Sequence, residues 1–397
     1  MSGFLPYGRQ LIEDDDVAAV ASVLRGDFLT TGPTVKAFEA AFAAKVDAPH
    51  AIACSSATAG LHLACLAAGI GPGDKVIVPT LTFLASANAA TYVGADVVFA
   101  DVDPETGLMT PATLEAAFAR AGGPVKAVFP VQLAGQMESP VAIAEIAARH
   151  GALVIEDACH ALGASYTTPE GVAPLGACRH AAMAVFSFHP VKTIAMGEGG
   201  AVTTRDPLLA ERLQRLVSHG MHKDPARFVN RDLGFDATGA PNPWYYEMPE
   251  PGYNYRASDI HCALGLSQLK KLDRFVAARA RLAARYDRLL APLAPRLAPI
   301  RRVAGCTPAW HLYAVLIDFE AIGLERSAVM KALLERGVGT QVHYIPVHLQ
   351  PFYRRRAGAL ALPGAERYYA RSLSLPLFPA MSEADVDRVV DALQTIR

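Results

Sequence analysis

Short runs of apolar residues alternate with alanine-rich stretches along most of the chain. Where apolar residues recur at helical spacing we expect helices, at Asp14–Leu24, Ala59–Ala68, Val141–His150 and Ile260–Leu290. The uninterrupted apolar runs have the length of buried strands and lie at Val76–Pro79, Val97–Ala100, Ala127–Pro130, Leu153–Glu156, Ala184–Phe188 and Ala201–Thr203. This alternation is typical of an α/β protein with a mainly parallel sheet, which binds ligands at the carboxyl ends of its strands.

The pattern changes between residues 225 and 254, where proline, glycine and aromatic residues are frequent and no periodicity is visible. We interpret this segment as a long irregular connection, a feature that is often functional in compact proteins. Beyond the long helix, strand-like runs at Leu312–Asp318 and Thr340–Tyr344 and a helix at Arg326–Arg336 indicate a further unit. We therefore expect a large domain over residues 1–264 and a smaller C-terminal α/β domain over residues 265–397.

Composition narrows the functional classes. The 397 residues are 52% hydrophobic and 19% charged with a formal net charge of −1, so a large core is expected and no nucleic-acid partner. Neither a membrane-spanning run nor a signal peptide is visible, which predicts a cytoplasmic protein without membrane attachment. The 6 cysteines contain no C-x-x-C pair, which favours reduced thiols over disulfides or a metal site.

One lysine stands out in the stretch SFHPVKTIAMGEGG. Lys192 follows a predicted strand whose exit carries Ser187 and His189, and it precedes a glycine-rich turn that lets backbone approach a ligand closely. Apolar neighbours would desolvate the amine, lower its pKa and make it a nucleophile able to form a Schiff base. The alternative is an ordinary solvated lysine on a loop.

Pyridoxal phosphate is a common partner for such a lysine, and its chemistry makes three demands that the sequence can meet. An acid must face the ring nitrogen, and Asp157 follows the strand LVIE. A helix N-terminus suits the phosphate, and Ser55, Ser56 and Thr58 begin an apolar helix. An aromatic ring should cover the cofactor, and Phe83 follows the strand VIVPT. Taken singly, each residue has a structural alternative as a helix cap, a turn or a core side chain.

Three other patterns have simpler structural explanations. The glycines of Gly69–Gly73 precede a strand and include a proline, so they predict a turn and not the loop of a nicotinamide-dependent oxidoreductase. His219 and His222 lack the helix and glutamate of a metalloprotease motif, so no metal is expected there. The acidic run Glu13–Asp16 is expected to stabilise a helix dipole on a solvated face.

Several motifs, in a fixed order, resemble the DegT/DnrJ/StrS family of sugar aminotransferases. They are SSATAGLHLA, PTLTFLASANAA, EDACHALG, SFHPVKTIAMGEGG and GYNYRASDIHCALGLSQL, and the similarity runs from LPYGRQ to QVHYIPVHLQPFY. The resemblance implies fold type I of the pyridoxal-phosphate-dependent transferases, like aspartate aminotransferase. It also implies bound pyridoxal 5′-phosphate and a homodimer with shared active sites.

The resemblance also implies roles for individual residues. Lys192 would bind the cofactor covalently and shuttle protons, Asp157 would pair with the pyridine nitrogen, and His160 would lie beside the ring. The expected phosphate ligands are Ala57, Thr58 and Ser187, together with Asn254 reaching into the neighbouring subunit. Ala57 replaces a glycine frequent in the family, which backbone amides should tolerate. The expected substrate-pocket residues are Tyr7, His189, His343 and Tyr344, each with a packing role as the alternative.

Within the family, segments such as FLTTGP, SHGM and QVHYIP are most similar to the transaminases of the pseudaminic-acid pathway. This similarity implies amination of C4 of UDP-2-acetamido-2,6-dideoxy-β-L-arabino-hex-4-ulose, with L-glutamate as donor, to give UDP-4-amino-4,6-dideoxy-N-acetyl-β-L-altrosamine. GDP-perosamine-type and other UDP- or dTDP-linked 4-amino-sugar synthases share these segments and stay open as alternatives. A non-catalytic, regulatory nucleotide-sugar-binding protein is a further alternative, which the presence of Lys192 and Asp157 disfavours.

Overall fold

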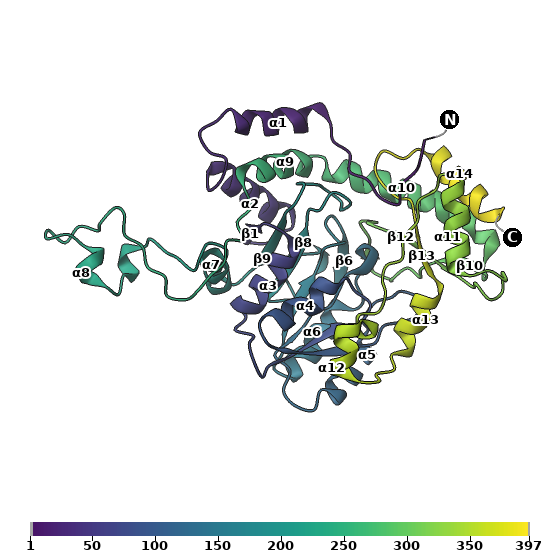
Figure 1. The fold of residues 1–397 in the computed structure, drawn as a ribbon, viewed down its shortest axis with the longest axis horizontal. Coiled ribbons are helices and arrows are strands. Elements are labelled where there is room, and N and C mark those ends of the chain that lie inside the picture. Colours follow the sequence, from purple (N-terminus) through teal and green to yellow (C-terminus); the bar gives the residue numbers. More distant parts are fainter. Residues whose placement is uncertain (1–2, 396–397) are drawn as a thin grey trace.

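A seven-stranded sheet forms the centre of the molecule in the computed structural model, which describes residues 3–395 (Figure 1). Its strand order is β1-β9-β8-β5-β4-β2-β3, and only β9 runs against the other strands. The strands are β1 (His50–Cys54), β2 (Lys75–Pro79), β3 (Asp96–Ala100), β4 (Ala127–Val128), β5 (Leu153–Asp157), β8 (Met183–Ser187) and β9 (Gly200–Thr204). The predicted strands of this sheet are confirmed, and β1 is an addition that the sequence analysis missed.

Helices cover both faces of this sheet, as expected for a parallel sheet buried on each side. One face packs against α3 (Ala57–Ala67), α4 (Leu84–Tyr92) and α7 (Pro207–Leu216), and the other against α2 (Pro33–Lys45), α5 (Pro111–Arg120) and α6 (Pro140–Arg149). On the second face, the rings of Phe42 and Phe186 meet edge to face with centroids 5.1 Å apart. These layers fix the sheet, and therefore the positions of its strand ends.

The C-terminal part has a core of its own around a three-stranded antiparallel sheet, β10 (Leu297–Pro299), β12 (Tyr313–Ile317) and β13 (Ser372–Leu375). Its helices are α10 (Leu272–Leu290), α11 (Arg326–Glu335), α12 (Pro351–Ala357), α13 (Pro363–Arg371) and α14 (Glu383–Gln394). Short 3₁₀ turns lie in this part at Ala291–Leu293 and Val347–Leu349, and earlier in the chain at Leu133–Gly135 and Pro225–Arg227. The N-terminal arm joins this part through Leu5, whose backbone pairs with Val338.

Two expectations for this half of the chain are wrong, and so is the one for the acidic run near the N-terminus. The single helix expected over residues 260–290 is two helices, α9 (Asp259–Leu269) and α10, because Lys271 closes a tight turn onto the carbonyl of Gln268. From this turn, Lys271 contacts Asp15 and Asp16 of α1 (Asp14–Leu24) at 2.5 and 2.8 Å. Asp16 is therefore fully buried, whereas the acidic run was expected to be solvated.

The strand expected over residues 340–344 does not form. Only Gln341 pairs, as an isolated bridge to Ser374, because the side chains that follow turn into a cavity. The expected domain boundary after residue 264 falls inside α9, so the division into domains stays a prediction.

The proline-rich segment projects from the body as a separate lobe carrying α8 (Arg231–Gly234) (Figure 1). A second small sheet, β11-β6-β7, consists of Cys306–Thr307, Ser165–Thr168 and Gly171–Pro174 and lies beside the central one. All 6 cysteines are free thiols. No helix within residues 3–395 has the length and apolarity to cross a membrane.

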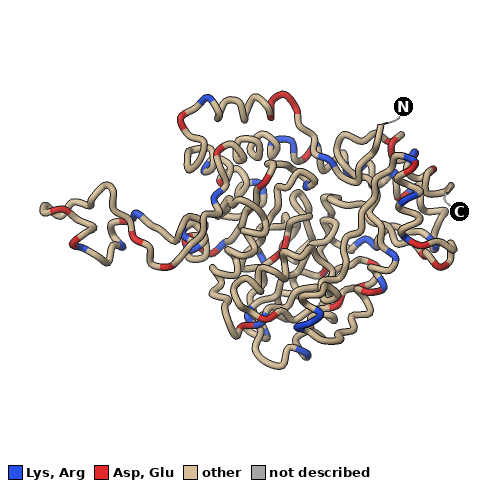
Figure 2. Tube along the Cα trace, in the orientation of Figure 1, with Lys and Arg blue, Asp and Glu red and all other residues tan. Residues whose placement is uncertain are grey.

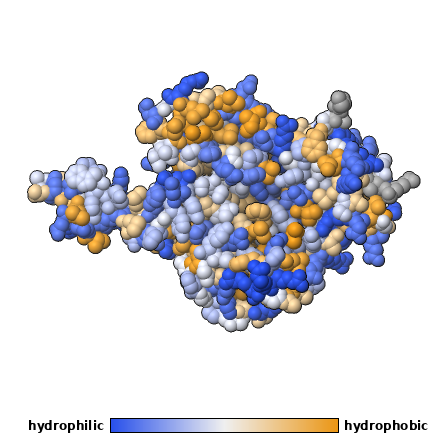
Figure 3. Space-filling view, in the orientation of Figure 1, coloured by the Kyte–Doolittle hydropathy of each residue, from blue (hydrophilic) through white to orange (hydrophobic). Residues whose placement is uncertain are grey.

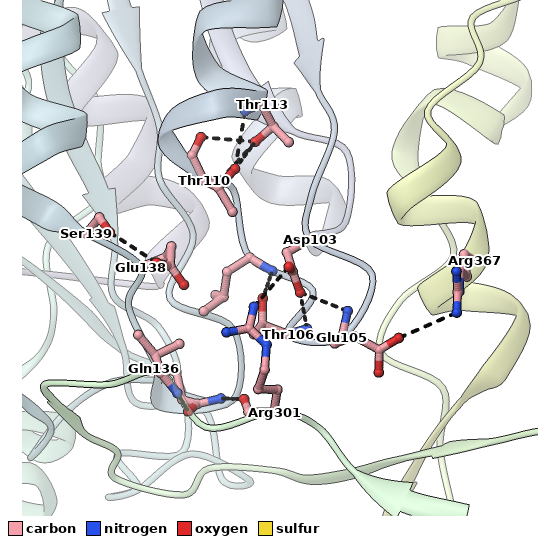
Figure 4. A network of polar contacts seen from close by, with 12 residues as sticks. Asp103, Glu105, Thr106, Thr110, Thr113, Gln136, Glu138, Ser139, Arg301 and Arg367 are labelled. Carbon is pink, nitrogen blue, oxygen red and sulfur yellow. Dashed lines mark hydrogen bonds and ion pairs between the residues drawn. The ribbon is translucent and has the colours of Figure 1, made fainter. Parts of the chain in front are cut away.

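Polar contacts tie the connection between the two parts to the large sheet (Figure 4). Gln136, which is fully buried, donates to the carbonyl of Arg301 at 3.2 Å and accepts from the amide of Val303 at 3.0 Å. The Arg301 guanidinium in turn contacts Asp103 at 2.9 Å. Elsewhere, basic and acidic residues are interspersed along the chain (Figure 2).

Candidate active site

A cavity of about 590 Å³ opens where β5 and β8 end. Asp157 is the last residue of β5 and Ser187 the last of β8, so the parallel register places both at the same edge of the sheet. The N-terminus of α3 forms one wall, and the segment from Gln341 to Ile345 forms another. Of the expected site residues, only Ser55 and Asn254 do not line this cavity.

Lys192 enters the cavity from the loop after β8, where its backbone amide donates to the carbonyl of His189 at 2.8 Å. Its Nζ lies 3.5 Å from Nε2 of His311. Burial lowers the pKa of the amine, although the charge of Asp157 opposes this shift. The lysine is thus disposed to present a neutral, nucleophilic nitrogen.

Asp157 is almost fully buried, with 6% of its surface exposed, and both of its oxygens are engaged. Oδ2 accepts a hydrogen bond of 2.6 Å from the hydroxyl of Ser86, and Oδ1 accepts one of 3.2 Å from the amide of Cys159. These contacts fix the carboxylate at the end of the strand without neutralising it with a cation. It can therefore face a protonated ring nitrogen in the cavity.

The start of α3 provides amide donors for an anion. Ser56 caps the helix by accepting from the amide of Ala59 at 3.1 Å, and Ala57 and Thr58 follow as the first helical residues. Their amides have no partner within the helix, and the helix dipole adds partial positive charge. Gly200 lets β9 pass close by, since a Cβ there would lie 2.6 Å from the carbonyl carbon of Ser56.

Imidazole rings surround Lys192. The amide of Ala134 donates to Nδ1 of His160 at 3.4 Å, so the proton of the neutral ring lies on Nε2, which faces the Tyr344 hydroxyl at 3.1 Å. The rings of His160 and His311 lie 4.3 Å apart. Burial lowers the pKa of His160 and His311, and that of His343 to about 3. The cluster is thus uncharged near neutral pH.

The remaining expected residues differ in exposure, from the buried His343 to the exposed Phe83. His343 contacts Ser374 through Nδ1 at 2.8 Å, and the ring of Tyr7 lies 5.5 Å from its ring. Phe83 is 57% exposed and lies 6.0 Å from the Tyr344 ring. His189 lines the cavity from the same loop as Lys192.

Asn254 lies apart from this cavity. Its backbone forms an isolated bridge with Ser218, at the base of the projecting lobe. Its expected contact with a neighbouring subunit stays a prediction.

Other cavity residues were not predicted from the sequence, notably His311, Cys159, Glu198 and Gln341, nor was Ser86, which is buried outside the cavity lining and bonds to Asp157. His311 precedes the strand-like run at residues 312–318, and this histidine beside an apolar run was its only signal. Within the described residues, no cluster of three or more His, Cys, Asp or Glu side chains could hold a metal ion.

These residues fit pyridoxal 5′-phosphate. A buried amine, an unneutralised buried carboxylate and a helix N-terminus line one cavity, and they match the aldehyde, the ring nitrogen and the phosphate. The close approach of Gly200 to the start of α3 adds a backbone cradle that a larger residue would fill.

Comparison with known proteins agrees with this assignment. The chain is 41% identical to the spore coat polysaccharide biosynthesis protein SpsC of Bacillus subtilis over 396 residues, covering 99% of this chain and 97% of that protein. Among solved structures, it resembles PseC of Helicobacter pylori, an aminotransferase involved in pseudaminic acid biosynthesis. That match has a TM-score of 0.87 and 28% identity, over 98% of each chain.

A second solved structure carries the cofactor. The pyridoxal-phosphate form of the sugar aminotransferase Spr1654 of Streptococcus pneumoniae matches with a TM-score of 0.85 and 27% identity, over 99% of this chain and 98% of that one. The fold is accordingly that of the type I transferases, as the resemblance implied, and the protein is a pyridoxal-phosphate-dependent aminotransferase. The family profile itself matches residues 10–394, and the chain belongs to the DegT/DnrJ/EryC1/StrS aminotransferase family.

Proposed function

We propose that this enzyme transfers the amino group of L-glutamate to C4 of a UDP-linked 4-keto-6-deoxy sugar. The products are 2-oxoglutarate and the 4-amino sugar nucleotide. The observation that carries this proposal is the cavity at the ends of β5 and β8, into which both the Lys192 amine and the Asp157 carboxylate project.

Lys192 is the proposed catalytic residue. Bound pyridoxal phosphate supplies an aldehyde that an amine can attack and a cationic ring that accepts electrons. In one half-reaction the unprotonated Nζ of Lys192 would take a proton from the α-carbon of the donor and pass it to the cofactor. In the other half-reaction Nζ would take a proton back from the cofactor and deliver it to C4 of the sugar. Its lowered pKa keeps a larger share of the amine unprotonated near neutral pH than for a solvated lysine.

The other cavity residues bind and orient. Asp157 holds the proton on the ring nitrogen, because a buried carboxylate favours the charged form of its partner. Ala57, Thr58 and Ser187 would hold the phosphate, and His160 would lie beside the cofactor ring. Phe83 would cover that ring. The proposed substrate residues are Tyr7, His189, His343 and Tyr344.

We place the active site between two copies of the chain, as the family resemblance implies. Asn254 lies outside the cavity of its own chain, so its role at a phosphate requires a neighbour. Apolar side chains gather on the face that carries α1 and recur on the lobe (Figure 3). The exposed residues include Val17, Leu24, Phe28 and Leu29 in the first region and Val229, Leu233 and Trp244 in the second. Burying these surfaces against a second copy would stabilise a homodimer.

The likeness to PseC supports UDP-2-acetamido-2,6-dideoxy-β-L-arabino-hex-4-ulose as the substrate. The test is incubation with L-glutamate and a panel of UDP-, GDP- and dTDP-linked 4-keto-6-deoxy sugars, with product identification by mass spectrometry and NMR. We expect the UDP-linked L-arabino-hexulose to give UDP-4-amino-4,6-dideoxy-N-acetyl-β-L-altrosamine. Amination of only GDP- or dTDP-linked sugars would overturn this substrate, and amination of none would overturn the sugar specificity.

A further inference from the structure

The amine of Lys192 lies within hydrogen-bonding distance of His311. His311 lies just before β12, is 4% exposed, and its Nε2 is 3.5 Å from Nζ. The two residues are 119 positions apart in sequence and come from the two different parts of the fold. The contact therefore depends on how the C-terminal part closes over the end of β8.

Arg279 forms hydrogen bonds with the backbone at His311. This fully buried arginine of α10 donates through Nη1 to the carbonyls of Trp310, His311 and Leu377, at 3.3, 3.2 and 2.8 Å. Trp310 has a left-handed backbone with φ of 47°, a conformation that costs free energy for such a residue. A guanidinium buried without a carboxylate is also costly. Both unfavourable contributions arise at one peptide segment. The hydrogen bonds from Arg279 hold this segment in place and so fix where the imidazole lies.

The surroundings keep the imidazole that faces the lysine uncharged. Burial lowers the pKa of His311, and the nearby Lys192, His160, Arg279 and His343 lower it further, so the ring is neutral. Its Nδ1 is buried and has no hydrogen-bond partner. If the single proton lies on Nδ1, Nε2 is an acceptor that faces Nζ.

We propose that His311 is a positioning residue for Lys192: its Nε2 accepts a hydrogen bond from Nζ and so turns the lone pair of the amine into the cavity. The imidazole takes no proton from the lysine in this arrangement. It restricts the rotation of a long, flexible side chain whose nitrogen must reach one point. This inference rests on the proposed role of Lys192.

Two amide substitutions separate this role from simple space filling. A glutamine amide reaches the position of Nε2, whereas an asparagine amide reaches only that of Nδ1. In apoprotein mixed with pyridoxal 5′-phosphate, we expect His311→Asn to slow covalent capture at Lys192 by about fivefold to tenfold. His311→Gln should stay within about twofold of the parent, because it keeps an acceptor at Nε2. Capture is followed by absorbance and located by borohydride reduction and peptide mapping.

A second measurement uses the Lys192→Ala background, in which the cofactor binds without a covalent bond. If His311 acts through Lys192, His311→Asn leaves the dissociation constant of pyridoxal 5′-phosphate unchanged there. If His311→Asn weakens cofactor affinity in this background by about the factor by which it slows capture when Lys192 is present, the histidine shapes the pocket. That result would overturn the inference. Capture by His311→Asn at the parent rate would overturn it equally.

These outcomes are distinguishable from failure of the proposed function. If borohydride fixed the label at another residue, the role of Lys192 itself would fall. If the label lies on Lys192 and the histidine variants behave like the parent, only the positioning role of His311 is lost.

Discussion

The hydroxyl of Ser86 donates a hydrogen bond of 2.6 Å to Oδ2 of Asp157. Ser86 lies in the first turn of α4 and is fully buried, and its oxygen also lies 2.7 Å from the hydroxyl of Thr82. The carboxylate at the end of β5 is thus oriented by α4, whereas Lys192 lies on the loop after β8. A charge-assisted bond of this kind is stronger than one between neutral groups.

Replacing Ser86 by alanine should therefore lower kcat/KM for the keto sugar by about tenfold, because Asp157 loses an orienting donor. Steady-state kinetics measure the effect, and circular dichroism verifies the fold. Thr82→Val removes the next hydroxyl in the chain and should have a smaller effect. Equal losses in the two variants would contradict a direct role of Ser86 at Asp157.

Mixing two inactive variants tests the shared active site. A Lys192→Ala chain keeps its Asn254, and an Asn254→Ala chain keeps its Lys192. If each site combines Lys192 of one chain with Asn254 of the other, a mixed dimer contains one intact site. Activity should then rise well above that of either variant after subunit exchange, to about a quarter of the parent for complete random mixing.

The control is the same mixture without subunit exchange, followed by size-exclusion chromatography with light scattering. A mixture that exchanges subunits but gains no activity would show that Asn254 serves its own chain or no phosphate at all.

The pH dependence of stability should reveal the buried histidines. Burial lowers the pKa of His343 from 6.5 to about 3, so at pH 5 this side chain is protonated in the unfolded chain and neutral in the folded one. Because the unfolded state binds more protons, this histidine's contribution is fully present above about pH 6.5 and is lost as the pH falls. Protonation of one such histidine in the unfolded chain lowers the free energy of unfolding by about 2 kcal/mol between pH 7 and pH 5.

We expect the free energy of unfolding of His343→Gln to fall by about 2 kcal/mol less than that of the parent over this interval. Urea unfolding at the two pH values measures the difference, and any constant effect of the substitution cancels. An equal fall in both proteins would place His343 in a solvated environment.

The network that joins the two parts of the fold contains both buried and exposed polar contacts, so their effects on stability can be compared (Figure 4). Gln136 is fully buried, so Gln136→Leu leaves the amide of Val303 and the carbonyl of Arg301 unpaired. This should cost about 1–3 kcal/mol. The Arg301 side chain is 54% exposed in its pair with Asp103, so Arg301→Ala should cost less than about 1 kcal/mol. The reverse order in urea unfolding would contradict this interpretation.

The sequence predicts those parts of the site that are set by neighbouring residues in the chain, such as the end of a strand or the start of a helix. Buried parallel strands are continuous apolar runs, so the ends of β5 and β8 can be located, and with them Asp157 and Ser187. The start of α3 is likewise visible from its serine cap. By contrast, β1 consists largely of small residues (HAIAC) and gives a weak strand signal.

Features that depend on distant contacts could not be predicted in this way. The break between α9 and α10 coincides with Lys271 meeting the acidic residues of α1, more than 250 positions earlier in the chain. His311 reaches Lys192 only because the C-terminal part folds over the large sheet. Neither contact has a local pattern, since any lysine fits a helix and a histidine before a strand is unremarkable.

Two neighbouring glycines provide a matched test of the phosphate cradle. At Gly200 a Cβ would lie 2.6 Å from the carbonyl carbon of Ser56 and 2.7 Å from the amide nitrogen of Ala57, so Gly200→Ala must displace the start of α3. At Gly199 the nearest atoms belong to the side chain of Met196, with its sulfur at 3.0 Å, and this flexible chain can move. We expect Gly200→Ala to weaken the affinity for pyridoxal 5′-phosphate by at least about tenfold, and Gly199→Ala by less than about threefold. Equilibrium dialysis of the apoproteins measures both, and it would contradict the cradle if the two substitutions had the same effect, because only one of them touches the backbone that carries the amide donors.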